Sequence, residues 1–117
     1  MPRDYRTIPT ELTIRATSSN VIQFELYNGT ARYDLSSVGT VELWLKNQAG
    51  GTSMTDNLTG KLSINGTAGG SITYTPASGD LVAGSAPYHA YFKLKPAGSQ
   101  LFFPEANELT INVREAF

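Results

Sequence analysis

Few residues of this chain have the chemistry of a catalyst. His89 is the only histidine among 117 residues, and there is no cysteine. A zinc site needs several imidazole or thiolate ligands, so His89 lacks the usual partners and is interpreted as a solvated strand residue. No Gly-x-Ser-x-Gly sequence or comparable setting is present to activate a serine or threonine. We therefore predict that the protein is not an enzyme and expect no catalytic residue, no metal site and no cofactor.

Two expected loops carry oxygen atoms of the kind that Ca²⁺ prefers. Asp56 is followed by Asn57, and Glu105 lies close to Asn107 and Glu108. Neither stretch has the spaced acidic pattern of a recognised calcium loop. Solvated loop residues are the favoured interpretation, with a calcium site as the alternative.

Large aromatic residues offer a different chemistry, that of a binding surface. Apolar residues alternate in residues 40–46 so that Trp44 falls on the outward side, and the same count places Tyr91 outward in residues 88–95. Phe102, on the adjoining hairpin strand, extends the patch. Exposed aromatics are enriched at the centres of protein interfaces, so the sequence predicts an interface at Trp44, Tyr91 and Phe102. The alternative is that a bulge or another register turns Trp44 inward as the buried tryptophan of a sandwich.

Short alternating segments, closed by Gly, Asn or Ser turns, must position these residues. Alternation with a period of two places one set of side chains in a core and the other in water. The expected strands are residues 12–15, 20–27, 31–33, 40–46, 61–64, 71–75, 88–95, 101–103 and 109–113. Residues 52–59 are expected to form a loop or a weak edge strand. Spacing of this kind predicts an all-β fold, an immunoglobulin-like β-sandwich of about seven antiparallel strands in two sheets.

Turn signals and prolines divide the chain further. Asn28-Gly29 and Asn65-Gly66 predict tight turns, and residues 80–83 could form one helical turn. Tyr88 follows at the distance of a tyrosine corner, although a plain core tyrosine is the alternative. We expect residues 1–11, broken by prolines, to form an extended N-terminal arm that becomes ordered on a neighbouring subunit, and residues 12–117 to form a single domain.

Charge and composition restrict the class of partner. Nine basic and ten acidic residues nearly balance, and the basic ones are scattered along the sequence. Nucleic acid and anionic membrane need a concentrated positive surface, so neither is expected as a partner. No apolar run follows the first residues, so we expect no secretory signal and synthesis in a cytoplasm.

Several segments together resemble a known family. They are residues 21–26 before a glycine turn, 34–36 leading into 41–46, 70–75, 88–94, Gly98, Phe103-Pro104 and 109–113. In this pattern the chain resembles the immunoglobulin-like N-terminal domain of phage baseplate upper proteins. The family's compact glycine-x-tyrosine entry to the penultimate strand is here lengthened to residues 84–88. The resemblance implies a structural component of a tailed-phage tail or baseplate, located in the virion.

The leading hypothesis combines this resemblance with the aromatic patch. It is a non-enzymatic structural subunit of a tailed-phage virion, in the tail, baseplate or neck, which packs against other virion structural proteins as a homo- or hetero-oligomer. A head decoration protein of the capsid is one alternative. The other is a carbohydrate-binding module, in which Trp44 and Tyr91 stack on sugar rings.

Overall fold

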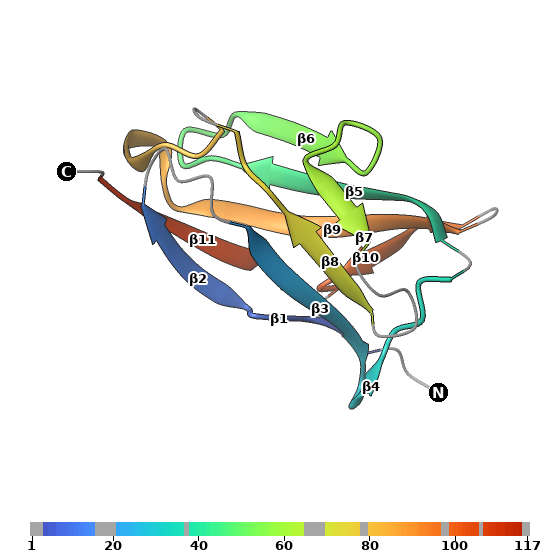
Figure 1. Ribbon diagram of the computed structural model, residues 1–117. Helices are drawn as coiled ribbons and strands as arrows, with labels where there is room; N and C mark the ends of the chain where they lie inside the picture. The colour runs from blue at the N-terminus through green and yellow to red at the C-terminus, as the bar shows by residue number, and fades with distance from the viewer. Residues whose placement is uncertain are drawn as a thin grey trace.

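The computed structural model describes residues 4–15, 21–36, 38–64, 70–77, 80–96, 99–105 and 107–115. Within these residues the chain forms eleven strands and one short 3-10 turn, arranged as two sheets packed face to face (Figure 1). The fold is an immunoglobulin-like β-sandwich, as predicted. The described residues contain eleven strands where about seven were expected, because short strands such as β4 and β10 pair with the longer β3 and β9.

The first sheet has five strands. Its strands are β1 (Tyr5–Ile8), β3 (Ile22–Asn28), β4 (Ala31–Arg32), β7 (Leu62–Ile64) and β8 (Ser71–Tyr74). Their order is β1-β3-β8-β7, and β4 pairs with β3 through a hairpin. The predicted turn at Asn28-Gly29 is confirmed, since Gly29 has a φ of 66° that favours glycine. The other predicted turn, Asn65-Gly66, lies outside the described residues.

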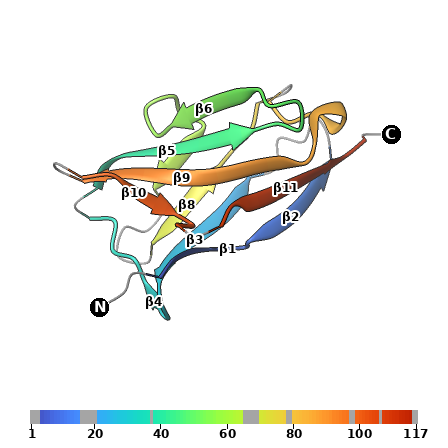
Figure 2. The same ribbon diagram turned by 180° about the vertical axis from the view of Figure 1, so that it is seen from behind.

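The second sheet has six strands and carries the predicted binding residues. Its strands are β2 (Glu11–Arg15), β5 (Val38–Lys46), β6 (Thr52–Asp56), β9 (Tyr88–Pro96), β10 (Leu101–Phe103) and β11 (Leu109–Arg114). Their order is β2-β11-β9-β5-β6, with β10 also paired to β9. Figure 2 shows the molecule with this sheet toward the viewer. β6 is therefore an edge strand, one of the two predicted possibilities for this segment.

Alternate side chains of both sheets meet in one core. Phe24 of β3 and Phe92 of β9 are fully buried, and their ring centroids lie 5.0 Å apart in an edge-to-face arrangement. Tyr88 begins β9 and is buried, and its hydroxyl accepts a hydrogen bond of 3.0 Å from the backbone N–H of Val82. This contact is a tyrosine corner, so Tyr88 has that role and is not simply a core tyrosine. The helical turn lies at Ala83–Ser85, slightly later than predicted.

The N-terminal residues differ from the expected arm. Residues 5–8 form β1, which pairs antiparallel with β3. Thr7 is fully buried, and the Tyr5 ring stacks on Phe103 with centroids 4.4 Å apart. Pro9 does not separate these residues from the domain. It lies between β1 and β2, where the chain passes from the first sheet to the second. The sandwich thus includes residues that the sequence assigned to an arm.

One strand pair also departs from the predicted antiparallel pattern. β2 pairs with β11 in parallel, with Leu12 beside Ile111 and Ile14 beside Val113. The two strands lie about a hundred residues apart in sequence, so no hairpin constrains their direction. The second sheet is therefore mixed, and the first is antiparallel throughout its described pairs.

Candidate functional site

Three aromatic side chains gather on the outer side of the six-stranded sheet. Trp44 of β5 lies directly opposite Tyr91 of β9, and their rings are nearly parallel, at 11°, with centroids 6.4 Å apart. The Tyr91 and Phe102 rings meet edge to face at 5.5 Å. We call Trp44, Tyr91 and Phe102 the aromatic face. The structure thus brings together the three residues that the sequence assigned to an interface.

Trp44 points outward because the register of β5 is regular around it. Leu43 and Leu45, its neighbours in sequence, are buried in the core. The one irregularity of the β5–β9 pair lies between Val38 and Thr40, before Trp44, so it leaves the direction of the indole unchanged. The alternative of an inward, core tryptophan therefore does not hold.

The aromatic face is only partly exposed to solvent. Trp44 and Tyr91 are half-buried, and Phe102 is 36% exposed. The Nζ atom of Lys93 lies 5.3 Å from the centroid of the Trp44 ring and 5.8 Å from that of Phe102, within range of a cation–π interaction. Met54, opposite Trp44 on β6, is 43% exposed and extends the apolar surface. The surface is therefore apolar with a basic group over part of it.

A buried carboxylate holds the indole of Trp44 in place. The Nε1 atom of Trp44 donates a 2.9 Å hydrogen bond to Oε1 of Glu42, and Nζ of Lys95 lies 2.9 Å from Oε2. The Glu42 side chain is only 8% exposed, although it is on the outward side of β5. The Lys95 ammonium, helped by the indole N–H, lowers the pKa of the Glu42 carboxyl, while its burial acts in the opposite direction. Trp44 therefore has its polar atom satisfied within the chain and presents its rings outward.

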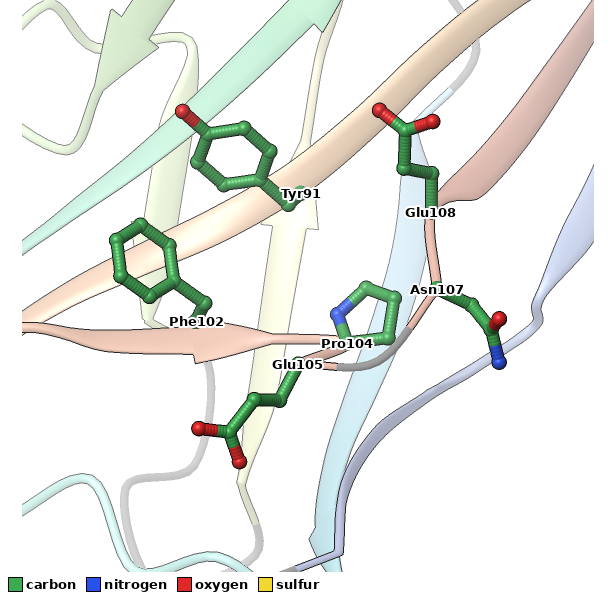
Figure 3. A pocket seen from close by; sticks show the side chains of 6 residues that line it. All are labelled: Tyr91, Phe102, Pro104, Glu105, Asn107 and Glu108. Atoms are coloured by element: carbon green, nitrogen blue, oxygen red, sulfur yellow. The ribbon is translucent and has the colours of Figure 1, made fainter.

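A depression of about 690 Å³ opens beside the aromatic face. Its lining residues are Tyr91, Phe102, Pro104, Glu105, Asn107 and Glu108. Figure 3 shows the rings of Tyr91 and Phe102 on one side, the Glu108 carboxylate on the other and the Pro104 ring between them. We call this hollow the Tyr91 depression.

The strand pairing explains why a depression forms at Tyr91. Two short strands share the same edge of β9: β10 pairs with residues 92–94 and β11 with residues 88–90. Tyr91 lies at the junction, where the segment between the two strands leaves the edge of the sheet. Residues 104, 105, 107 and 108 therefore border a hollow where a continuous strand would have filled the edge.

Two smaller depressions adjoin this one and share residues with it. One of about 190 Å³ is lined by Trp44, Leu45, Lys46, Thr52, His89, Tyr91 and Glu108. Another of about 360 Å³ is lined by Asp4, Tyr5, Arg6, Thr7, Ile8, Thr10, Pro104, Asn107 and Glu108. Glu108 lines all three, so it occupies the centre of a groove system that runs from the aromatic face to β1.

The other candidate residues have local roles. The Oδ1 atom of Asp56 accepts hydrogen bonds from the backbone N–H groups of Leu58 and Thr59, and Oδ1 of Asn57 accepts one from Val41. Both side chains stabilise the turn after β6. His89 is half-buried beside Lys46. No cluster of three or more His, Asp or Glu residues able to hold a metal ion occurs within the described ranges.

The outer side of the five-stranded sheet is different in character. Glu25 and Arg32 form an ion pair of 2.7 Å, and the Tyr27 hydroxyl donates a 3.3 Å hydrogen bond to Glu25. The hydroxyls of Ser63 and Thr73 lie 2.6 Å apart. Two apolar side chains are exposed at its border, Ile8 at 47% and Val21, just before β3, at 61%. The Arg32 guanidinium lies over the Tyr27 ring, and the paired hydroxyl and charged groups make the described part of this surface mainly polar.

Sequence reasoning missed two features of the site. Nothing in the alternating pattern distinguishes Glu42, which is buried under Trp44 and Lys95, from an ordinary solvated carboxylate. The Tyr91 depression also escaped it, although the short spacing between residues 101–103 and 109–113 was a signal that two strands share one edge.

Comparison with known proteins gives the fold and no family. No protein-family model and no curated protein matches the sequence. Among solved structures, the chain is similar to one chain in a structure titled "Structural basis of T cell specificity and activation by the bacterial superantigen toxic shock syndrome toxin-1". The TM-score is 0.61 at 11% sequence identity, with 97% of this chain and 100% of that chain covered. At this identity the likeness shows the sandwich fold alone. The described residues also include no helix long and apolar enough to cross a membrane.

Proposed function

We propose that this protein is a non-enzymatic structural subunit of a tailed-phage virion, in the tail, baseplate or neck, that binds neighbouring subunits through its aromatic face. The observation that carries the binding mode is the cluster of three adjoining aromatic rings, Trp44, Tyr91 and Phe102, on one outer surface. The opposite surface is mainly polar, and its Tyr27 ring is covered by Arg32. The virion setting is supported by the resemblance of the sequence segments to the phage baseplate domain.

The geometry of the aromatic face suits an interface centre. Aromatic side chains contribute large apolar areas at little cost in conformational entropy, and they dominate the binding energy of many interfaces. The hydrogen bond from Trp44 to Glu42 and the contact with Tyr91 restrict the indole before any partner arrives. A restricted anchor loses less entropy on binding, so this arrangement favours association.

The polar groups around the aromatic face agree with the same function. Lys93, Lys95 and Glu42 surround the rings with charged groups, of which Glu42 and Lys95 already pair with each other. A central apolar area with a polar rim is typical of protein interfaces. A capsid decoration protein would use the same surface, and the identity of the neighbouring subunit decides between the positions on the particle.

Carbohydrate binding is the second candidate, favoured by one specific observation. The rings of Trp44 and Tyr91 are close to parallel and lie beside depressions lined by acidic and amide side chains. Parallel aromatic rings can stack on sugar rings while polar side chains bind hydroxyl groups. Soluble glucose, galactose and N-acetylglucosamine oligomers should then change the fluorescence of Trp44, whereas a protein interface predicts no change.

The test compares Trp44→Ala with Tyr27→Ala, which removes a half-buried aromatic residue from the opposite surface. Truncation of an aromatic anchor at an interface centre costs about 2 kcal/mol or more, roughly a 30-fold loss of affinity. We expect Trp44→Ala to weaken association by at least this amount and Tyr27→Ala to leave it unchanged. Sedimentation velocity of the protein, alone and with purified virion components, measures both.

The folding of the variants is checked separately by thermal unfolding. Because Trp44 is half-buried and donates a hydrogen bond to the Glu42 carboxylate, its truncation should lower the free energy of unfolding by about 2 kcal/mol. Phe102→Ala, at the more exposed end of the aromatic face, supplies a second variant if Trp44→Ala folds poorly. Normal association by a folded Trp44→Ala protein and by Phe102→Ala would refute the proposed function.

A further inference from the structure

One carboxylate in the groove system forms no hydrogen bond or ion pair among the residues that the structure describes. Eight of the ten acidic residues have an interaction with another group: Asp4, Glu11, Glu25, Asp34, Glu42, Asp56, Asp80 and Glu105. The side chains of Glu108 and Glu115 have no hydrogen bond or ion pair with the described residues. Glu115 lies beyond the end of β11 and is exposed. Glu108 is the one that lines all three depressions.

The surroundings of Glu108 define the kind of group that would pair with it. Across the Tyr91 depression lie the rings of Tyr91 and Phe102, with Pro104 between (Figure 3). A carboxylate that faces aromatic rings across a hollow matches a cation with an extended apolar or planar body. Lys93 is not the cation that pairs with Glu108, since its Nζ lies over Trp44 and Phe102. Among the described residues, no cation lies over the Tyr91 ring.

Arginine fits this combination better than lysine does. Its guanidinium is planar, so it stacks on aromatic rings, and its fork of N–H groups matches both oxygens of a carboxylate. Lysine offers a compact and strongly hydrated charge that uses the rings less well. The depression is wide and open to solvent, which leaves room for the residues that flank such a side chain.

We propose that the Tyr91 depression binds an arginine side chain of the partner protein, whose guanidinium packs against Tyr91 and Phe102 and pairs with the Glu108 carboxylate. The inference rests on the proposed function, because it names the chemistry of the partner that the aromatic face binds. Charge complementarity carries it: the described lining residues include two acidic side chains, Glu105 and Glu108, and no basic one, and the Lys93 ammonium lies over Phe102 and Trp44. The partner segment therefore presents arginine where this protein presents Glu108.

The experiment titrates the isotope-labelled full chain with N-acetyl-arginine amide and follows the NMR signals of Tyr91, Phe102 and Glu108. N-acetyl-citrulline amide, a neutral compound of nearly the same shape, is the matched ligand control. We expect saturable shifts at these three residues with the arginine compound and at least tenfold weaker binding of the citrulline compound. Raising the salt concentration should weaken only the former.

Two matched variants locate the charge. Glu108→Gln should weaken binding of the arginine amide at least fivefold, whereas Glu115→Gln, which removes the other unpartnered carboxylate, should leave it unchanged. Equal binding of the arginine and citrulline compounds, no saturable shift at Tyr91, or an equal loss in both variants would overturn the inference.

These experiments distinguish failure of the arginine inference from failure of the proposed function. If the arginine amide fails to bind but Trp44→Ala still abolishes association, the aromatic face remains the interface and the arginine inference is wrong. If the arginine amide binds at Glu108 but neither Trp44→Ala nor Glu108→Gln affects association, the depression is an arginine site and the proposed interface is wrong. When both hold, Glu108→Gln should also weaken association at least fivefold.

Discussion

The two outer surfaces of the sandwich follow the same alternating pattern but carry different side chains. On the five-stranded sheet, hydroxyl and charged groups bond to one another, as Ser63 does with Thr73 and Glu25 with Arg32. On the six-stranded sheet, Trp44 and Tyr91 occupy the outward positions instead. Alternation therefore determines which residues face outward, and the chemistry of that outward set indicates which surface has a partner.

The ion pairs of the two surfaces differ in the same way. Glu25 and Arg32 lie 2.7 Å apart with side chains 25% and 45% exposed. Glu42 and Lys95 lie 2.9 Å apart, but the Glu42 side chain is only 8% exposed. The charges are alike and the distances similar, but Glu42 lies on an inner strand between β9 and β6 and also accepts a hydrogen bond from the indole N–H of Trp44. The pair beneath the aromatic face is part of its construction, whereas the other is an ordinary surface pair.

The largest expected effect lies in the core that both sheets share. Phe92→Ala should lower the free energy of unfolding by about 3–5 kcal/mol, because the fully buried ring packs against Phe24 and its removal leaves a cavity. Lys93→Ala, the next residue on the outward side of β9, should cost less than about 1 kcal/mol. Urea unfolding of both variants measures the contrast, and the reverse order would show that β9 is turned the other way.

A smaller effect separates the two ion pairs. Glu42→Gln should cost about 1–2 kcal/mol, because a largely buried charge-assisted hydrogen bond with Lys95 is lost. Glu25→Gln, in the more exposed pair, should cost no more than about 0.5 kcal/mol. The same urea experiment applies. Equal losses would mean that Trp44 does not shield the Glu42 pair from solvent.

The pH dependence of stability sharpens this contrast further. Lys95 lowers the pKa of Glu42 in the folded protein, so the folded state holds the proton less tightly than the unfolded state does. The resulting stabilisation is complete above the unfolded pKa of about 4.3 and is lost as the pH falls through the lower folded pKa. The difference in stability between wild type and Glu42→Gln should therefore shrink between pH 5 and pH 3. A difference that stays constant over this interval would contradict the assignment.

Much of the site could be predicted because it depends on local alternation. The outward direction of Trp44 and Tyr91 follows from their own strands, and their proximity follows from the neighbouring positions of those strands in an immunoglobulin-like sheet. The tyrosine corner at Tyr88 is likewise a local pattern. A period of two is enough for such statements, because each needs only the strand itself and the fold class.

The remaining features depend on contacts between distant segments. β1 was not predicted because its inward residues, Tyr5 and Thr7, are not aliphatic, and the partner that buries Tyr5 is Phe103 from the far end of the chain. The parallel pairing of β2 with β11 has no local signal either. The Tyr91 depression exists because two strands share one edge of β9, which residue types in one segment do not reveal.

The most direct test of the central claim uses the protein's single tryptophan as a probe. Trp44 is the only tryptophan of the chain, so its fluorescence reports on the aromatic face alone. Acrylamide quenching is measured for the isolated subunit and for the assembled fraction, in which any partner protein carries Trp→Phe substitutions so that Trp44 remains the only emitter. If the aromatic face is the interface, the emission of Trp44 shifts to shorter wavelength on assembly and acrylamide quenches it at least threefold less. Unchanged emission and unchanged quenching in the assembled fraction would show that another surface makes the contact.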